Sequence, residues 1–255
     1  AGLAGLNAAW VAAACGHTVR LVEEEAMPGG QFRQACVPPH KQLLARAVTY
    51  YSNMCKKYGV ETLYNTKADK AMVDEYKPDV LILATGGVPL APGSIPGLRD
   101  AGCLTNREIL AGYVAPGPKV LMLGGGLHGA ETADFMGEHG YDVTVIEMRD
   151  TIAVQDHPAV QKLLVERLKS HNAELITSAT VKHVYPDGVD YEKDGELCHI
   201  GGFDSVVLAF GSRSYNPLEE EMKDFGGKLI VLGDAEKASN GLDAIYNGTV
   251  TGLDI

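Results

Sequence analysis

The spacing of hydrophobic residues changes repeatedly between a helical and a strand period along the first third of the chain. An alanine-rich run over residues 4–15 predicts a helix, and residues 17–22 predict the strand that follows it. An amphipathic helix is expected over 41–58, followed by a strand over 60–65 and a short helix over 69–76. Helices and strands in this alternating order are typical of an α/β fold.

The run Val80-Leu81-Ile82-Leu83 contains no polar position. A strand without alternation is typical of a parallel sheet covered on both faces, so we expect residues 79–84 to be buried. The pattern returns later, with strands over 119–123 and 142–147 and a helix over 158–171. That helix is expected to bury one face, which consists of Val160, Leu163, Leu164 and Leu168.

From residue 180 to 200 the hydrophobic period becomes two. Turn sequences at Pro186-Asp187-Gly188 and Asp194-Gly195 divide this segment, which predicts a three-stranded antiparallel meander. Further strands are expected over 204–210 and 229–232. The tail, residues 242–255, has helical spacing, although Gly248 and Gly252 count against a helix.

One glycine-rich turn occurs twice. The intact copy is Gly124-Gly125-Gly126-Leu127-His128-Gly129, and a helix-compatible run follows it. The other copy, Ala1-Gly2-Leu3-Ala4-Gly5, fits the last two glycines of the same pattern, and we expect its first glycine and entering strand upstream. Each copy leads, at the same interval, to a strand that ends in an acid, Glu23 in the first unit and Glu147 in the second.

A glycine turn, a helix and an acidic strand end in this order are typical of a dinucleotide site. The helix start offers amide donors and the positive end of its dipole to a pyrophosphate, and glycine keeps a β-carbon out of the way. The acid accepts hydrogen bonds from the ribose hydroxyls. Two units predict two bound dinucleotides that exchange electrons. The alternative is that the glycines only permit tight packing of helix on strand.

Two residues of the intact unit bear on the choice of cofactor. Glu147 favours NADH over NADPH, because a carboxylate repels a 2′-phosphate. Arg149 is the counter-argument, since a guanidinium could bind that phosphate. His128 lies inside the turn, where it either contacts the cofactor or is an exposed side chain at the start of a helix.

Composition excludes several other classes of function. The net charge of −11 argues against a nucleic-acid partner. No apolar run approaches the ~20 residues that cross a bilayer, so no membrane partner is expected. The 5 cysteines are scattered without a C-x-x-C pair, and the 8 histidines have no ligand spacing. We therefore expect a cytoplasmic protein with no metal site in this segment.

Further motifs, in matching order, resemble a known family. They are Gly29-Gly30-Gln31 with Val37-Pro38-Pro39, Ala84-Thr85-Gly86, the intact turn with Glu131, Val145-Ile146-Glu147-Met148, and Gly233-Asp234 before Leu242-Asp243-Ala244-Ile245. Over essentially its whole length the chain resembles the C-terminal part of the 2,4-dienoyl-CoA reductase, 2-enoate reductase and trimethylamine dehydrogenase family. These are large NADH:flavin oxidoreductases related to old yellow enzyme.

The resemblance implies two Rossmann-like, three-layer dinucleotide-binding domains, with an NAD(H) domain inserted into an FAD domain. The expected limits are 1–98 and 215–255 for the FAD-binding domain and 99–214 for the NAD(H)-binding domain. A proline-rich crossing over residues 89–97 supports the first boundary. The first domain is expected to bind FAD, or only ADP as in the trimethylamine dehydrogenase branch.

The resemblance also implies roles for individual residues. Those expected to hold FAD are Gly2, Gly5 and Glu23 at its ADP half, Ala68 at the adenine, Gly30 and Gln31 along the pyrophosphate and flavin, Thr85 and Gly86 over the diphosphate, and Gly233 and Asp234 at the ribityl chain. Those expected to hold NADH are Gly124, Gly126, Gly129 and Glu147, with Glu131 near the nicotinamide ribose. His128 is a further candidate only through its position in the turn.

Family members carry an upstream (β/α)₈ barrel with FMN and a four-cysteine iron–sulfur cluster, neither of which this segment contains. The resemblance implies that hydride passes from NADH to FAD, and that electrons continue through the cluster to FMN, which reduces an activated alkene. Positioning of the cofactors suffices for hydride transfer, so no catalytic side chain is predicted. The alternative is a module that holds ADP and has no hydride path.

Overall fold

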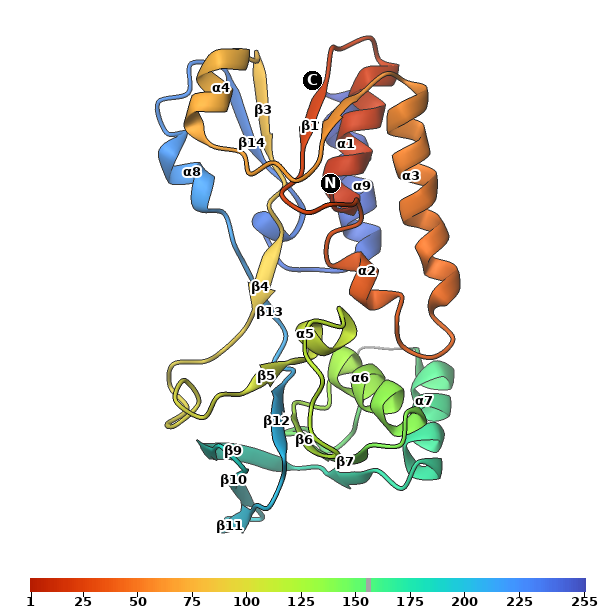
Figure 1. The fold of residues 1–255 in the computed structure, drawn as a ribbon, viewed down its shortest axis with the longest axis vertical. Helices are drawn as coiled ribbons and strands as arrows, with labels where there is room; N and C mark the ends of the chain where they lie inside the picture. Colours follow the sequence, from red (N-terminus) through yellow and green to blue (C-terminus); the bar gives the residue numbers. More distant parts are fainter. Residues whose placement is uncertain (155–156) are drawn as a thin grey trace. The chain divides into compact units, whose positions relative to one another are not determined.

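The computed structural model describes residues 1–154 and 157–255, and Figure 1 shows its helices and strands. The chain divides into two compact units. Unit 1 comprises Ala1–Cys36, Leu43–Val88 and Ser212–Ile255, and unit 2 comprises Val37–Gln42 and Pro89–Gly211. One α/β unit is thus inserted into the sequence of the other. The domain limits predicted from the sequence stay a prediction.

Unit 2 is built on a five-stranded parallel sheet with the strand order β5-β12-β6-β7-β8 (Figure 1). The strands are β5 (Leu104–Thr105), β6 (Lys119–Leu123), β7 (Asp142–Ile146), β8 (Glu174–Ile176) and β12 (Ser205–Leu208). Alternate residues of β6 enter two different cores. Val120 and Met122 pack with helix residues, and Leu121 and Leu123 pack with residues of the meander. Both faces of β6 are covered, which explains why its sequence is continuously apolar.

Helices α6 (Leu127–Glu138) and α7 (Pro158–Ser170) contact each other and contribute to the same core. The prediction for α7 was wrong in part. Leu164 and Leu168 are buried, whereas Val160 and Leu163 are exposed. Of these four residues, only Leu164 and Leu168 belong to the core that α7 shares with α6 and the sheet. The short α5 (Asn106–Leu110) begins with a capping box between Thr105 and Glu108.

The predicted antiparallel meander is confirmed as β9 (Ala179–Tyr185), β10 (Gly188–Lys193) and β11 (Glu196–Ile200). Asp194, at the second turn, has a φ of 53° and precedes Gly195 at 83°. Two successive residues at positive φ match the twist of the strands they connect, which is why Asp-Gly is favoured there.

The described strands of unit 1 include two separate parallel pairs, β1 (Arg20–Val22) with β2 (Glu61–Leu63) and β3 (Val80–Leu83) with β14 (Lys228–Val231). A further pair joins β13 (Ser212–Ser214) to β4 (Gly87–Pro89). The expectation that residues 79–84 are fully buried was wrong. In β3 only Leu83 is buried, and the preceding three residues are half-buried. Among the described strands, β3 has one hydrogen-bonded neighbour, β14.

Helices α1 (Leu3–Ala14), α3 (Ala45–Lys57) and α9 (Gly241–Leu253) pack together in unit 1 (Figure 1). The helix predicted for the tail is confirmed as α9, and its glycines allow it to pack against α1. A Cβ on Gly248 would lie 2.5 Å from the Ala4 carbonyl oxygen, and one on Gly252 would lie 2.8 Å from the Ala8 carbonyl oxygen. Glycine therefore allows the two helix backbones to approach closely.

The helix predicted over 41–58 begins later, with a 3₁₀ turn at Gln42–Leu44 before α3. Pro38 and Pro39 precede it, and His40 has a φ of 65°, which is not helical. The remaining elements of the chain are α2 (Phe32–Ala35), α4 (Lys70–Tyr76), β4 (Gly87–Pro89), β13 (Ser212–Ser214), α8 (Pro217–Glu221) and a 3₁₀ turn at Gly233–Ala235. None of the described helices is long and apolar enough to cross a membrane.

Candidate dinucleotide sites

The intact glycine turn joins the carboxyl end of β6 to the start of α6 in unit 2. Gly124 has a φ of 105°, and its N–H donates to the Ile146 carbonyl at the end of β7, at 2.9 Å. A Cβ on Gly124 would lie 2.6 Å from the Ala209 carbonyl oxygen, and one on Gly129 would collide with the Gly124 carbonyl oxygen. The packing of the turn itself therefore requires these two glycines. For them, the alternative that glycine serves tight packing holds.

The Glu147 carboxylate faces this turn. Its Oε2 accepts from the Gly125 N–H at 2.7 Å, and its Oε1 accepts from the Arg149 N–H at 2.9 Å. The side chain is buried, with 7% of the residue exposed. A carboxylate has about four lone-pair sites, so two of them stay available to the hydroxyls of a ribose.

The start of α6 completes the site. Gly126 is its N-cap residue, with extended backbone at φ −61° and ψ −179°, and a glycine offers no side chain to cap the helix. The positive end of the helix dipole therefore meets the turn without a protein side chain at the N-cap. An anion is the natural occupant of such a position.

The first glycine turn repeats this arrangement in unit 1. The Ala1 backbone nitrogen donates to Glu23 Oε2 at 2.6 Å, and the Glu25 N–H donates to Glu23 Oε1 at 2.8 Å. Gly2 caps α1 with φ −70° and ψ −179°, as Gly126 caps α6. A Cβ on Gly2 would meet no atom within 4 Å, so open space lies in front of this helix start.

Residues far apart in sequence converge on the start of α1. A Cβ on Gly30, which has a φ of 49°, would lie 3.2 Å from Gly2 Cα, and one on Gly233 would lie 2.7 Å from Ala4 Cβ. The Gln31 side-chain amide donates to the Asp234 carboxylate. Gly5 is also close-packed, since its Cβ position is 3.4 Å from Ala84 Cβ. The structure thus brings together predicted site residues from three segments of unit 1.

Two further predicted residues make contacts of a different kind. The Thr85 hydroxyl donates to the Tyr215 carbonyl at 2.7 Å, and the Tyr215 N–H donates to the Gly86 carbonyl at 3.1 Å. Both bonds tie the end of β3 to the returning strand β13. Ala68 is half-buried in the loop between β2 and α4, two residues after Thr66, whose N–H donates to the Glu23 carbonyl at 2.9 Å.

Glu131 and His128 lie on α6 but differ in exposure. The Glu131 carboxylate is buried, with 8% of its side chain exposed, and forms an ion pair with Lys41. His128 is exposed, and its carbonyl accepts from the Thr132 hydroxyl at 2.7 Å. Lys41 is not a site residue predicted from the sequence, whose pattern places it in a helix. Pro38-Pro39, separated from Lys41 by His40 alone, is the signal that an irregular segment runs there.

Gly125 is a second site residue that was not predicted from the sequence, and its N–H donates to Glu147. Its Cβ position lies 3.0 Å from Glu147 Cβ and 2.5 Å from Ile152 Cδ1, so a side chain there would displace the acid. The signal was the third consecutive glycine of the turn.

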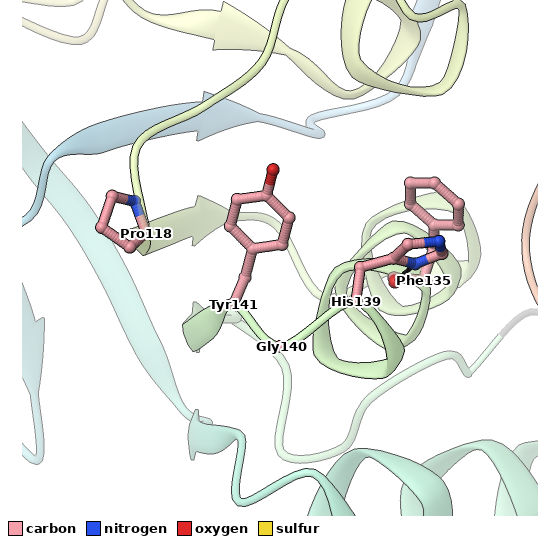
Figure 2. Close-up of a pocket in the computed structure, with 5 residues that line it drawn as sticks. All are labelled: Pro118, Phe135, His139, Gly140 and Tyr141. Atoms are coloured by element: carbon pink, nitrogen blue, oxygen red, sulfur yellow. Dashed lines mark hydrogen bonds between the residues drawn. The ribbon is translucent and has the colours of Figure 1, made fainter.

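A surface pocket in unit 2 lies at the amino ends of β6 and β7, opposite to the end that carries the glycine turn. Figure 2 shows Tyr141 between Pro118 and the adjacent rings of Phe135 and His139, whose centroids are 4.4 Å apart. Pro118 and Tyr141 directly precede β6 and β7, whereas the glycine turn and Glu147 follow these strands. Ligands of parallel α/β sheets bind at the carboxyl ends of the strands, so this pocket is separate from the dinucleotide site.

The 5 cysteines all lie in the described part of the chain, and each is a free thiol. Cys36 follows the Gly-Gly-Gln loop, is buried, and donates from Sγ to the Phe32 carbonyl. Burial raises the pKa of the Cys36 thiol. A raised pKa leaves little thiolate at neutral pH, so Cys36 is a packing residue.

Two α/β units, one inserted into the sequence of the other and each with a glycine turn and a buried acid, define the class of flavin-dependent pyridine-nucleotide oxidoreductases. The family model for the pyridine nucleotide-disulphide oxidoreductases matches residues 1–223, and the chain belongs to that family. The resemblance identified from the motifs is confirmed.

Similar proteins are reductases and oxidases that are longer than this chain. The bilirubin reductase of Mediterraneibacter gnavus is 34% identical over 256 residues, which cover 97% of this chain and 38% of that protein. The NADH oxidase of Thermoanaerobacter brockii is 32% identical over 253 residues, which cover 97% and 39%. A solved structure of 2-naphthoyl-CoA reductase has a TM-score of 0.93 at 29% identity and covers 100% of this chain and 39% of that one. The chain therefore spans about two fifths of the length of these relatives.

Proposed function

We propose that unit 1 binds FAD, that unit 2 binds NADH, and that the chain transfers hydride from NADH to FAD. The observation that carries this proposal is the repeated acid and glycine-turn arrangement. Glu23 and Glu147 each accept from the backbone nitrogen of the turn and from the residue two positions after themselves. Glycines needed only for packing do not explain why a buried carboxylate faces each turn.

In unit 2, the proposed contacts follow from the donors and acceptors of the turn. Glu147 accepts from the hydroxyls of the adenosine ribose, and the start of α6 at Gly126 binds the pyrophosphate. Gly124 and Gly129 shape the turn by close packing. His128 is exposed at the helix start, where it can meet the cofactor, and Glu131 is assigned to the side of the nicotinamide ribose.

In unit 1, Glu23 has the role of Glu147, and Gly2 and Gly5 the roles of Gly126 and Gly129. Gly30, Gln31, Gly233 and Asp234 surround the same helix start, which suits the pyrophosphate and ribityl portions of FAD. The backbone at Ala68 is assigned to the adenine. Thr85 and Gly86 are assigned to the diphosphate, and both also form hydrogen bonds with Tyr215 directly after β13.

NADH is proposed over NADPH because of the charge at Glu147. Both carboxylate oxygens accept backbone N–H groups, which hold the acid at this position, and a carboxylate there opposes a 2′-phosphate. The Arg149 side chain is exposed, and its backbone N–H already holds the Glu147 carboxylate. This supports Arg149 as a structural neighbour of the acid rather than a phosphate ligand.

When bound, NADH supplies a hydride and FAD accepts it. The residues of this chain contribute binding and orientation, since no side-chain acid or nucleophile is required for the transfer. The hydrogen bonds to Glu147 and Glu23 hold these acids in place before a ligand arrives, so little ordering cost remains for binding.

We further propose that the chain is part of a longer polypeptide with an upstream FMN-binding barrel and a 4Fe-4S cluster. This chain would then feed electrons to an upstream FMN and iron–sulfur barrel that reduces an activated alkene of the enoate or dienoyl-CoA type. The relatives are more than twice as long as this chain, and one is named as a reductase of a CoA thioester. Five free thiols fit a reducing cytoplasm, which we propose as the location.

The decisive experiment is anaerobic titration of the full-length protein with NADH while the flavin absorbance is followed. We expect bleaching of a second flavin in addition to FMN, with a much weaker response to NADPH. Mass spectrometry of the nucleotides released on denaturation is expected to detect FAD. Release of ADP without FAD would support the alternative of a nucleotide-holding module, and the absence of any adenine nucleotide would refute both.

A further inference from the structure

The loop between β7 and α7 contains a buried residue in a strained conformation. Ala153 has a φ of 55° and is 0% exposed. In the described part of the chain the other non-glycine residues at positive φ are all exposed, namely His40, Asn65, Lys77, Asn172, Ser178 and Asp194. A left-handed alanine costs roughly 1–2 kcal/mol, so specific contacts must hold Ala153 in this conformation.

Those contacts connect the loop to the glycine turn. The Ala153 N–H donates to the Gly125 carbonyl at 2.8 Å. Ile152 Cδ1 occupies the space beside Gly125, 2.5 Å from where a Cβ would be. On the other side, the Gly125 N–H donates to Glu147 Oε2. Gly125 is therefore fixed through both of its backbone polar groups.

A side chain of α7 supports the same loop. Gln161 is half-buried, and its Nε2 donates to the Ile152 carbonyl at 2.6 Å and approaches Thr151 Oγ1 at 3.4 Å. The Ile152 carbonyl and the Ala153 N–H belong to one peptide group. Gln161 thus donates to the carbonyl of the Ile152–Ala153 peptide, and the N–H of the same peptide donates to Gly125.

The Gly125–Gly126 peptide is oriented in the same way. In a trans peptide the C=O and N–H point in opposite directions, so an acceptor bond at the Gly125 carbonyl sets the direction of the Gly126 N–H. Gly126 is the N-cap of α6, where the pyrophosphate is proposed to bind. Peptides in a hydrogen-bonded row also polarise one another, which strengthens the terminal donor.

We propose that Gln161 is a positioning residue for the pyrophosphate of NADH. It acts through the Ile152–Ala153 peptide and then the Gly125–Gly126 peptide, and it touches no ligand itself. This inference rests on the proposed binding of NADH by unit 2. Removal of the Gln161 donor is expected to lower the affinity for ligands that carry the pyrophosphate and to leave the affinity for ligands without it nearly unchanged.

The test compares the binding of ADP-ribose and adenosine to the full-length protein by calorimetry. Gln161→Met removes the donor at similar size, and Gln161→Glu replaces it with an acceptor. We expect the dissociation constant of ADP-ribose to rise roughly three- to tenfold in both variants, as for the loss of one hydrogen bond. Adenosine affinity should change less than twofold, and in turnover the KM for NADH should rise while kcat is kept.

Lys162→Met is the matched control, because Lys162 is the next residue of α7 and its side chain is 77% exposed. An equal loss of affinity for ADP-ribose and adenosine in the Gln161 variants would overturn the proposal, since it would indicate a general distortion of the site.

If both variants fail to fold, the Gly126 amide of the wild-type protein is followed by NMR. A large shift with ADP-ribose and none with adenosine supports the proposal, and no shift overturns it. Failure of the wild-type protein to bind ADP-ribose would instead refute the proposed function.

Discussion

The Gly125 N–H donates to Glu147 Oε2 at 2.7 Å, which joins a glycine turn to the acid at the end of the neighbouring strand. The same relationship links Ala1 and Glu23 in the other unit. In both cases the carboxylate is oriented by the backbone of the turn before any ligand binds. Substitution of one acid at a time can therefore distinguish the roles of the two sites.

Glu147→Ala is expected to raise the KM for NADH by about ten- to a hundredfold, because a charged hydrogen-bond acceptor for the ribose is lost. The flavin content should not change. Glu23→Ala is expected to lower the FAD content of the purified protein instead. Steady-state kinetics and flavin quantification of the two variants check this, and loss of FAD in Glu147→Ala would contradict the assignment of the units.

Gly129→Ala is expected to destabilise unit 2 by at least roughly 1–3 kcal/mol, because its Cβ would collide with the Gly124 carbonyl oxygen, which is backbone and cannot move aside. Gly226→Ala is the control, since a Cβ there meets nothing within 4 Å and the φ of Gly226 is not positive. Chemical denaturation monitored by circular dichroism measures both. A Gly129→Ala variant as stable as the wild type would show that the turn is wrongly described.

Lys41→Met is expected to destabilise unit 2 by about 2 kcal/mol, because it leaves the buried Glu131 carboxylate without its partner. The effect should be smaller than for a fully buried pair, since 30% of the Lys41 side chain is exposed. A Lys41→Met/Glu131→Gln double variant should recover more than half of the loss, which thermal melting can establish. Lys70→Met is the comparison, because its exposed pair with Asp74 is worth less than about 1 kcal/mol.

Cys55 makes stability depend on pH in the alkaline range. Burial raises the pKa of its thiol from 9.0 to about 11. The folded state keeps the proton that the unfolded state releases, so the contribution of this thiol is full below pH 9.0 and is lost between pH 9.0 and about 11. Cys55→Ala should flatten the fall in unfolding free energy over that range, measured by urea denaturation at several pH values. An unchanged slope would contradict the buried, neutral thiol.

Much of the fold followed from local patterns. The doubled glycine turn, the acid at a fixed interval after it and the change to a period of two at residue 180 identified the elements around each site, because these signals depend on neighbours within a few turns of chain. The glycine turn predicted Gly2, and the family resemblance implied Gly30 and Asp234. The segments that carry these three residues converge on one helix start.

Other features depended on contacts between distant segments. Gly248 argues against a helix when read alone, yet α9 includes it because α1 packs against its bare backbone. Val160 and Leu163 have helical spacing, yet they are exposed because α7 meets its neighbours along a narrow stripe. The pairing of Lys41 with Glu131 joins residues whose approach no local pattern encodes.

The amino-acid sequence by itself determined the two glycine turns and the acids that follow them, since spacing and periodicity are properties of a short stretch of chain. The insertion of one unit into the other was implied by the family resemblance of the motifs. Only the tertiary structure decided which groups hold those turns in place. The Gln161 side chain, the left-handed Ala153 and the orientation of Gly125 depend on packing between a loop, a helix and a strand end, and such packing is set by the whole core of the unit.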